Sequence, residues 1–182
     1  FQTIEAETVQ IVGKDHKTVD AIVVAYDRNT GFGLLRATSP LQVTPMPFGR
    51  SSEVKKGDPV LAVSYGSADT VHGVIVVERK EFAGPWEYLL ENAIFTAPPI
   101  ARFSGAGLID RNGHLVGIGY LLSQLMIADL GVIPTNMFVP IDLLKPILAE
   151  LVDSGEAGGS RRCDCVVCVR CDGGTLRVRP LV

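Results

Sequence analysis

The chain has 182 residues and a formal net charge of -3, from 17 Lys or Arg against 20 Asp or Glu. A chain of this length can bury on the order of 70% of the surface that its unfolded form exposes, so it can hold a sizeable core without metals or disulfides. Its charges are interspersed, and no basic stripe exists for a phosphate backbone, so we expect no nucleic-acid partner. No apolar run approaches the ~20 residues needed to cross a bilayer, which predicts a soluble globular chain without a membrane span.

Short apolar segments rich in Val and Ile run along most of the chain, separated by polar or glycine-containing turns. Their length and composition predict β-strands. In chain order we expect strands at residues 8–12, 21–26, 32–37, 59–64, 71–78, 89–96, 107–110, 115–122 and 137–141. Their spacing of about ten residues favours an all-β barrel or sandwich over an alternating βα fold.

A proline-rich stretch separates the first three of these segments from the others. Pro40, Pro45 and Pro47 would each deny a hydrogen-bond donor to a sheet ladder. We therefore expect residues 39–58 to link two halves of the chain.

The sharpest turn signal is Asn112-Gly113, a pair that readily adopts the positive φ angles of a tight hairpin turn. It separates the apolar segments 107–110 and 115–122. These two segments are therefore expected to pair antiparallel.

One helix is predicted near the end of the chain, at residues 142–154. Its apolar residues repeat at three-to-four-residue spacing, at Ile141, Leu144, Leu148, Leu151 and Val152. Asp142 is the expected N-cap and Gly155 lies past the end, while Pro146 is tolerable because it falls near the first turn. Residues 155–182 are expected to form a linker and a Cys-rich tail.

Four stretches in this order carry a resemblance to a known family. They are residues 23–27 with 31–36, residues 49–52 with 54–63, residues 103–109 with 112–118, and residues 136–142. In turn they resemble D-L-A-[LV]-L-[KR], G-x-S with V-G-[DE]-x-V-x-A-[IV]-G, the nucleophile loop G-N-S-G-G-P-L, and F-A-I-P-[IV]-D. These are motifs of the HtrA (DegP-like) trypsin-type serine proteases, and the match covers about residues 7–155.

The resemblance implies an all-β, chymotrypsin/trypsin-like double β-barrel with a C-terminal helix and an active site between the barrels. The expected domains are a partial first barrel at 1–38, the linker at 39–58, a second barrel at 59–141, the helix at 142–154 and the tail at 155–182. The tail would be the remnant of a PDZ start at most.

In this family a Ser attacks the scissile carbonyl, a His takes its proton, an Asp orients the His, and two backbone amides hold the oxyanion. The resemblance places the nucleophile at Ser104, whereas the Asp position falls on Gly31, which has no side chain. The family's His lies upstream of all the strands present here. Arg102 and Phe103 replace the Gly-Asn before the Ser, and Ala106 replaces a Gly, which alters the oxyanion loop.

The three histidines of the chain lie elsewhere: His16 in a turn, His72 at the start of a strand and His114 after the hairpin turn. None is expected to act as a base for Ser104. Asp27, four residues before Gly31, is a substitute for the orienting acid, but an Asp in a turn commonly binds its own backbone.

An aromatic group at Phe82, Trp86 and Tyr88 has two interpretations. It lines a peptide-binding cleft, because rigid aromatics anchor partners, or it packs in the core at a barrel seam. Both interpretations stay open.

All four cysteines fall within nine residues, at Cys163, Cys165, Cys168 and Cys171. Metal-binding knuckles usually separate two C-x-x-C pairs by a dozen or more residues, and this cluster lacks that separation. We expect no metal and no cofactor; disulfides and free thiols in the tail remain alternatives.

The sequence thus predicts a degenerate, proteolytically inactive homologue of a trypsin-like serine protease that binds an extended peptide or an unfolded protein segment by edge-strand addition. Self-association into a homo-oligomer is left open. The alternative is an active serine endopeptidase whose His lies in an upstream segment, and a third class is a metal-binding or redox tail on an inert scaffold. The resemblance implies an extracytoplasmic, periplasmic location, with any signal peptide upstream of Phe1.

Overall fold

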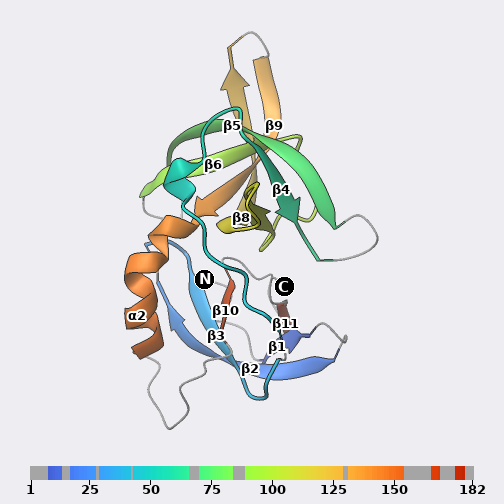
Figure 1. The fold of residues 1–182 in the computed structure, drawn as a ribbon, viewed down its shortest axis with the longest axis vertical. Helices are drawn as coiled ribbons and strands as arrows, with labels where there is room; N and C mark the ends of the chain where they lie inside the picture. Colours follow the sequence, from blue (N-terminus) through green and yellow to red (C-terminus); the bar gives the residue numbers. More distant parts are fainter. Residues whose placement is uncertain are drawn as a thin grey trace. The chain divides into compact units, whose positions relative to one another are not determined.

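The computed structural model describes residues 8–13, 17–27, 29–41, 43–65, 70–83, 89–128, 131–153, 165–168 and 175–178. The chain divides into two compact units (Figure 1). The first comprises Phe1–Met46 and Leu144–Val182, and the second comprises Pro47–Leu143. Within the described residues, no helix has the length and apolar character needed to cross a membrane.

The first unit is built on a five-stranded sheet. Its strands are β1 (Thr8–Val12), β2 (Thr18–Tyr26), β3 (Gly33–Ala37), β10 (Cys165–Cys168) and β11 (Thr175–Val178). The strand order is β10-β3-β2-β1-β11, so the two strands of the tail pair with both edges of the β1–β3 meander. Helix α2 (Lys145–Asp153) contacts β2 and therefore belongs to this unit.

The second unit contains a closed antiparallel barrel. Its strands are β4 (Pro59–Val63), β5 (Val71–Ala83), β6 (Leu89–Ala97), β7 (Gly107–Ile109), β8 (Leu115–Ile127) and β9 (Gly131–Pro140). They follow the order β4-β5-β6-β9-β8-β7, and β4 pairs with both β5 and β7 to close the ring. Figure 1 shows the hairpin of β8 and β9 extending beyond the other strands of this unit.

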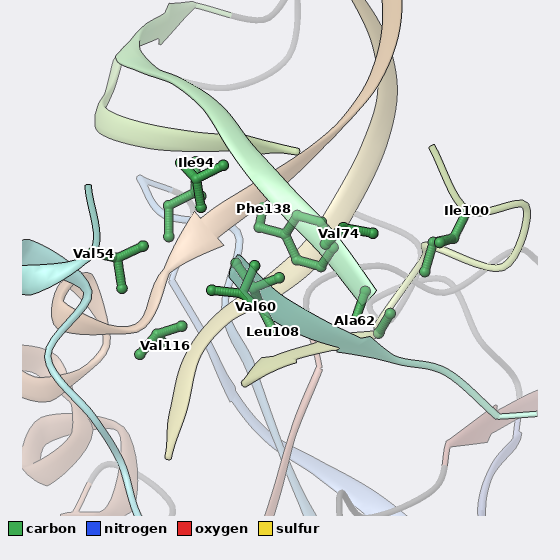
Figure 2. Close-up of a cluster of buried hydrophobic side chains, with 11 residues drawn as sticks. Val54, Val60, Ala62, Val74, Ile94, Ile100, Leu108, Val116 and Phe138 are labelled. Carbon is green, nitrogen blue, oxygen red and sulfur yellow. The ribbon is translucent and has the colours of Figure 1, made fainter. Parts of the chain in front are cut away.

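The barrel closes around a cluster of buried apolar side chains contributed by alternate residues of its strands (Figure 2). Because side chains alternate between the two faces of a strand, every second residue of β4 and β5 points into this core. The cluster consists of Val54, Val60, Ala62, Val74, Val76, Ile94, Ile100, Ala106, Leu108, Val116 and Phe138.

All nine predicted strands are present, but four extend three or more residues beyond their apolar segments. β2 begins at Thr18, β5 continues to Ala83, β8 continues to Ile127, and β9 begins at Gly131. Polar residues such as Ser123 and Gln124 interrupt the apolar run of β8. They remain in the strand because the backbone pairing with β9 continues past them to the end of the hairpin.

The predicted pairing across Asn112-Gly113 is confirmed, since β7 and β8 are antiparallel. The connection is a hairpin turn, in which the Gly113 N–H donates to the Asp110 carbonyl at 3.1 Å and the Asp110 N–H donates to the His114 carbonyl at 3.0 Å. Only Gly113 has a positive φ, of 80°, so Asn112 does not adopt the positive φ that the sequence predicts for the pair. The Asp110 carboxylate accepts hydrogen bonds from the N–H groups of Asn112 and His114, at 2.8 and 2.9 Å, and thereby stabilises the turn.

The predicted helix begins three residues late, because Asp142 is not its N-cap. Asp142 lies in a separate 3-10 turn, η2 (Ile141–Leu143). Its carboxylate accepts a hydrogen bond at 2.8 Å from the N–H of Ser52, in the 3-10 turn η1 (Ser51–Glu53), and its own N–H donates to Ser51 Oγ at 3.1 Å. The two turns therefore cap each other.

Arg79 of β5 holds the segment before β4 against the barrel. Its guanidinium donates to the backbone carbonyls of Ser51, Val54 (2.6 Å) and Asn92 (2.9 Å). Burial lowers the pKa of Arg79, and the nearby charge of Asp142 opposes that effect. A planar fork with several donors suits this role, because it can reach carbonyls on different segments at once.

A tight backbone contact joins β8 to the turn formed by residues 103–106. The N–H of Gly119 donates to the Ala106 carbonyl at 2.7 Å, and the Gly119 carbonyl accepts from the N–H of Gly105 at 2.8 Å. A Cβ atom at position 119 would lie 1.9 Å from the Phe103 carbonyl oxygen. Only glycine fits there, so this residue sets how closely the turn approaches β8.

Leu108→Ala should destabilise the second unit by about 3 kcal/mol, because it removes a fully buried side chain from the barrel core and leaves a cavity. Chemical denaturation would measure the loss. The control is Met126→Ala, at a side chain that is 74% exposed, where the change should stay within about 0.5 kcal/mol. Equal losses in the two variants would contradict the core assignment.

Gly119→Ala should destabilise the protein by about 3 kcal/mol, since the added methyl group overlaps a backbone oxygen that cannot move without opening the turn. Gly73→Ala is the matched control, because a Cβ atom there meets nothing within 4 Å. Thermal melts of both variants would compare them. A Gly119→Ala melt that matches the Gly73→Ala melt would show that the contact does not constrain the turn.

Candidate functional site

Ser104 occupies the second position of the turn that precedes β7. The N–H of Ala106 donates to the Phe103 carbonyl at 2.9 Å, and Gly105 has a φ of 73°. A positive φ at the third position is what a type II turn requires, and glycine supplies it without strain. The turn leaves Ser104 exposed, and within the described residues its hydroxyl has no hydrogen-bond partner.

Two backbone amides beside this serine are unpaired. Among the described parts of the chain, no acceptor lies within hydrogen-bond range of the N–H of Arg102 or of Ser104. Arg102 does not carry the strain that replacing a glycine predicts, because Asn92 is the one described non-glycine residue with a positive φ. In trypsin-like proteases the backbone amides of the nucleophile and of the residue two positions before it hold the oxyanion, so the two amides lie at the positions that the resemblance implies for that role.

A buried amide anchors the segment that leads into Ser104. Oδ1 of Asn136 on β9 accepts a hydrogen bond from the Ile100 N–H at 2.6 Å, and Nδ2 donates to the Ile100 carbonyl at 3.3 Å. Both residues are buried. The sequence analysis missed this anchoring role of Asn136, although an amide side chain directly before the apolar segment 137–141 was the available signal.

His114 lies beyond the far end of β7 and is too distant from Ser104 to act as its base. Ser104 lies three residues before this strand, and His114 lies beyond its other end. At about 3.3 Å per residue, the strand and its flanking residues separate the two side chains by more than a hydrogen bond. His114 instead lies near its own loop, with Nδ1 3.8 Å from Oδ2 of Asp110.

The other two histidines supply no base that the structure shows. His72 lies on β5 opposite Ala62, and it makes no hydrogen bond to Ser104. His16 lies outside the described residues.

The predicted acid position, Gly31, lies in a turn of the first unit. Its φ is 77°, which favours glycine over a residue with a side chain, and its N–H donates to the Asp27 carbonyl at 2.9 Å. The Asp27 carboxylate accepts hydrogen bonds from the N–H and hydroxyl of Thr30. Asp27 therefore binds its own turn, as its position in the sequence predicts.

Of the aromatic group, the structure describes Phe82, which is half-buried on β5. Its ring lies edge-on to the fully buried Phe95, with centroids 6.4 Å apart, and Lys80 Nζ lies 5.5 Å from the Phe95 centroid. This contact supports core packing for Phe82. Trp86 and Tyr88 lie outside the described residues.

The cysteine cluster is described in part. Cys165 and Cys168 are the end residues of β10, while Cys163 and Cys171 fall outside the described residues. Within the described ranges, no three His, Cys, Asp or Glu side chains gather where they would hold a metal ion. The alternatives for this cluster therefore stay predictions.

Comparison with known sequences identifies the family. The profile of the trypsin-like peptidase domain matches residues 2–118, which is more than half of the chain. Serine protease PepD of Mycobacterium tuberculosis is 29% identical over 155 residues, covering 79% of this chain and 33% of PepD. Periplasmic serine endoprotease DegP of Escherichia coli is 25% identical, covering 83% of this chain and 32% of DegP. The chain thus spans about a third of the length of these relatives.

Solved structures confirm the all-β, trypsin-like fold. The HtrA-type protease AlgW, determined with a decapeptide, superimposes with a TM-score of 0.62 at 22% identity, covering 88% of this chain and 55% of AlgW. Deg5 superimposes with a TM-score of 0.61 at 21% identity, covering 81% of this chain and 69% of Deg5. The chain therefore belongs to the trypsin-like peptidase family and is homologous to the HtrA-type serine proteases.

Proposed function

We propose that this chain is a proteolytically inactive HtrA-type homologue that binds an extended peptide segment through its second barrel. The observation that carries the proposal is an exposed serine beside an open strand edge, with no base to activate the serine in the described residues. A serine hydroxyl is a weak nucleophile until a neighbouring base takes its proton. In this proposal the barrel keeps a strand edge that can bind a peptide, but no base activates the Ser104 hydroxyl.

The proposed binding edge is β8 beyond Gly119. β7 pairs with β8 at Leu115, Gly117 and Ile118, and the turn carrying Ser104 pairs with Gly119. From Tyr120 onward, no described strand pairs with this edge of β8, while the other edge pairs with β9. An extended peptide would add to the free edge through main-chain hydrogen bonds, with its side chains contacting alternate residues of β8.

Related proteins support a peptide as the ligand and a location outside the cytoplasm. AlgW has been determined with a tripeptide and with a decapeptide. DegP of Escherichia coli is periplasmic, and we extend that location to this chain as part of the proposal.

One observation favours a second candidate function, an active serine endopeptidase. The unpaired amides of Arg102 and Ser104 would hold an oxyanion, and Arg102 shows no positive φ that would distort them. In that case the catalytic histidine would come from a segment upstream of Phe1.

A fluorophosphonate separates these two functions, because it reacts only with an activated serine. We expect no adduct on the chain by intact mass, since the described residues place no base at Ser104. Ser104→Ala and Ser52→Ala serve as matched variants, the second at an exposed serine in η1. A single adduct that Ser104→Ala removes and Ser52→Ala retains would establish the endopeptidase.

Peptide capture can be tested independently of proteolysis by fluorescence anisotropy with a labelled apolar peptide. N-methylation of every second peptide amide should weaken binding by tenfold or more, because it removes donors that strand addition needs. Ser104→Ala should leave the dissociation constant unchanged. Equal affinity for the methylated and unmethylated peptides would rule out addition to β8.

A further inference from the structure

β4 and residues Val71–Val77 of β5 are apolar on both faces apart from His72, although the barrel core covers only one of these faces. The inner face carries Val60, Ala62, Val74 and Val76, all buried. The register pairs the remaining residues on the opposite face: Pro59 with Ile75, Leu61 with Gly73, and Val63 with Val71. We call these six residues the outer β4–β5 face.

The outer β4–β5 face is exposed and uncharged. Leu61 is 44% exposed, Val71 55% and Ile75 50%. Strands that read as nearly continuous apolar runs are typical of strands covered on both faces. With these exposures the face offers on the order of 400 Å² of surface, which is within the size range of the largest apolar patch on a typical monomer and commonly marks an interaction site.

The kind of partner follows from the backbone pairing. β4 lies between β5 and β7, and β5 lies between β4 and β6, so neither strand has a free edge along this face. An extended peptide gains most of its affinity from backbone hydrogen bonds, which are not available here. The contact must be made by side chains against another flat apolar surface, as when two sheets pack face to face at about 10 Å.

The centre of the face is complementary to itself. Leu61 projects from β4 directly opposite Gly73 of β5. A Cβ atom at Gly73 would meet nothing within 4 Å, so the space above this glycine is open. Under a two-fold axis, Leu61 of each copy can enter the space above Gly73 of the other, which is the reciprocal contact that an isologous dimer requires.

We propose that the outer β4–β5 face binds a second copy of this chain. Two copies would bury at most about 800 Å² in total, which is below the size of a stable interface and fits a weak, reversible dimer. Because the face carries no charged side chain, the net negative charge of the chain produces no direct repulsion across it. This contact is independent of the proposed peptide binding, since it uses neither β8 nor the turn that carries Ser104.

Sedimentation velocity on the full chain, over a range of concentrations, tests this proposal. The wild-type chain should dimerise reversibly, and Gly73→Glu should raise the dissociation constant by at least tenfold. The variant should keep the wild-type melting temperature, since a side chain at position 73 meets no neighbour and glycine is unfavourable in strands. The matched control is Met126→Glu, which places the same charge on another exposed strand residue, in the β8–β9 hairpin.

A charge-swap experiment identifies the partner as a second copy. Gly73→Glu and Leu61→Lys should each be monomeric alone, whereas their equimolar mixture should recover the dimer, because position 61 of one copy faces position 73 of the other across the two-fold axis. A monomeric wild-type chain at high micromolar concentration would overturn the proposal. Dimerisation that survives Gly73→Glu, or that Met126→Glu abolishes instead, would also overturn it.

Discussion

Closure of six antiparallel strands into a barrel is the constraint on which the second unit depends. β4 pairs with β5 on one side and β7 on the other, so strands distant in sequence share one ring of backbone hydrogen bonds. The ring gives the backbone N–H and C=O groups of the strands hydrogen-bond partners, and the inner faces of the strands pack together as one buried apolar cluster. The segments between strands are then held at defined places on a rigid body, including the turn at Ser104.

That rigid framework fixes the backbone geometry around Ser104. Asn136 anchors the segment that leads into the turn, and Gly119, which has no side chain, allows the turn to lie close against β8. Both contacts involve the backbone of the loop and leave the Ser104 hydroxyl untouched. Proton transfer needs a base at hydrogen-bond distance, which the described residues do not place there. The contacts that hold the turn are thus distinct from the groups that would activate the serine, and a fold by itself does not establish a function.

The second unit exposes two surfaces that differ in the interactions they offer. The free edge of β8 offers backbone donors and acceptors, which suit an extended chain of varied sequence. The outer β4–β5 face offers only apolar side chains, which suit a flat surface of matching shape. In the first unit the two edges of the β1–β3 meander are not free, because β10 and β11 pair with them.

The sequence alone determined the strands, the order of the motifs, the family and the position of Ser104, because these depend on local apolar patterning and on short residue strings. It misplaced the helix start, and it missed Asn136. Each of these depends on a hydrogen bond whose partner or geometry the local pattern does not show: Asp142 bonds to Ser52, ninety residues away, and Asn136 to Ile100, thirty-six residues away. Only the tertiary structure decided such contacts, since a polar side chain chooses among cap, loop and long-range partners according to what folding brings within reach.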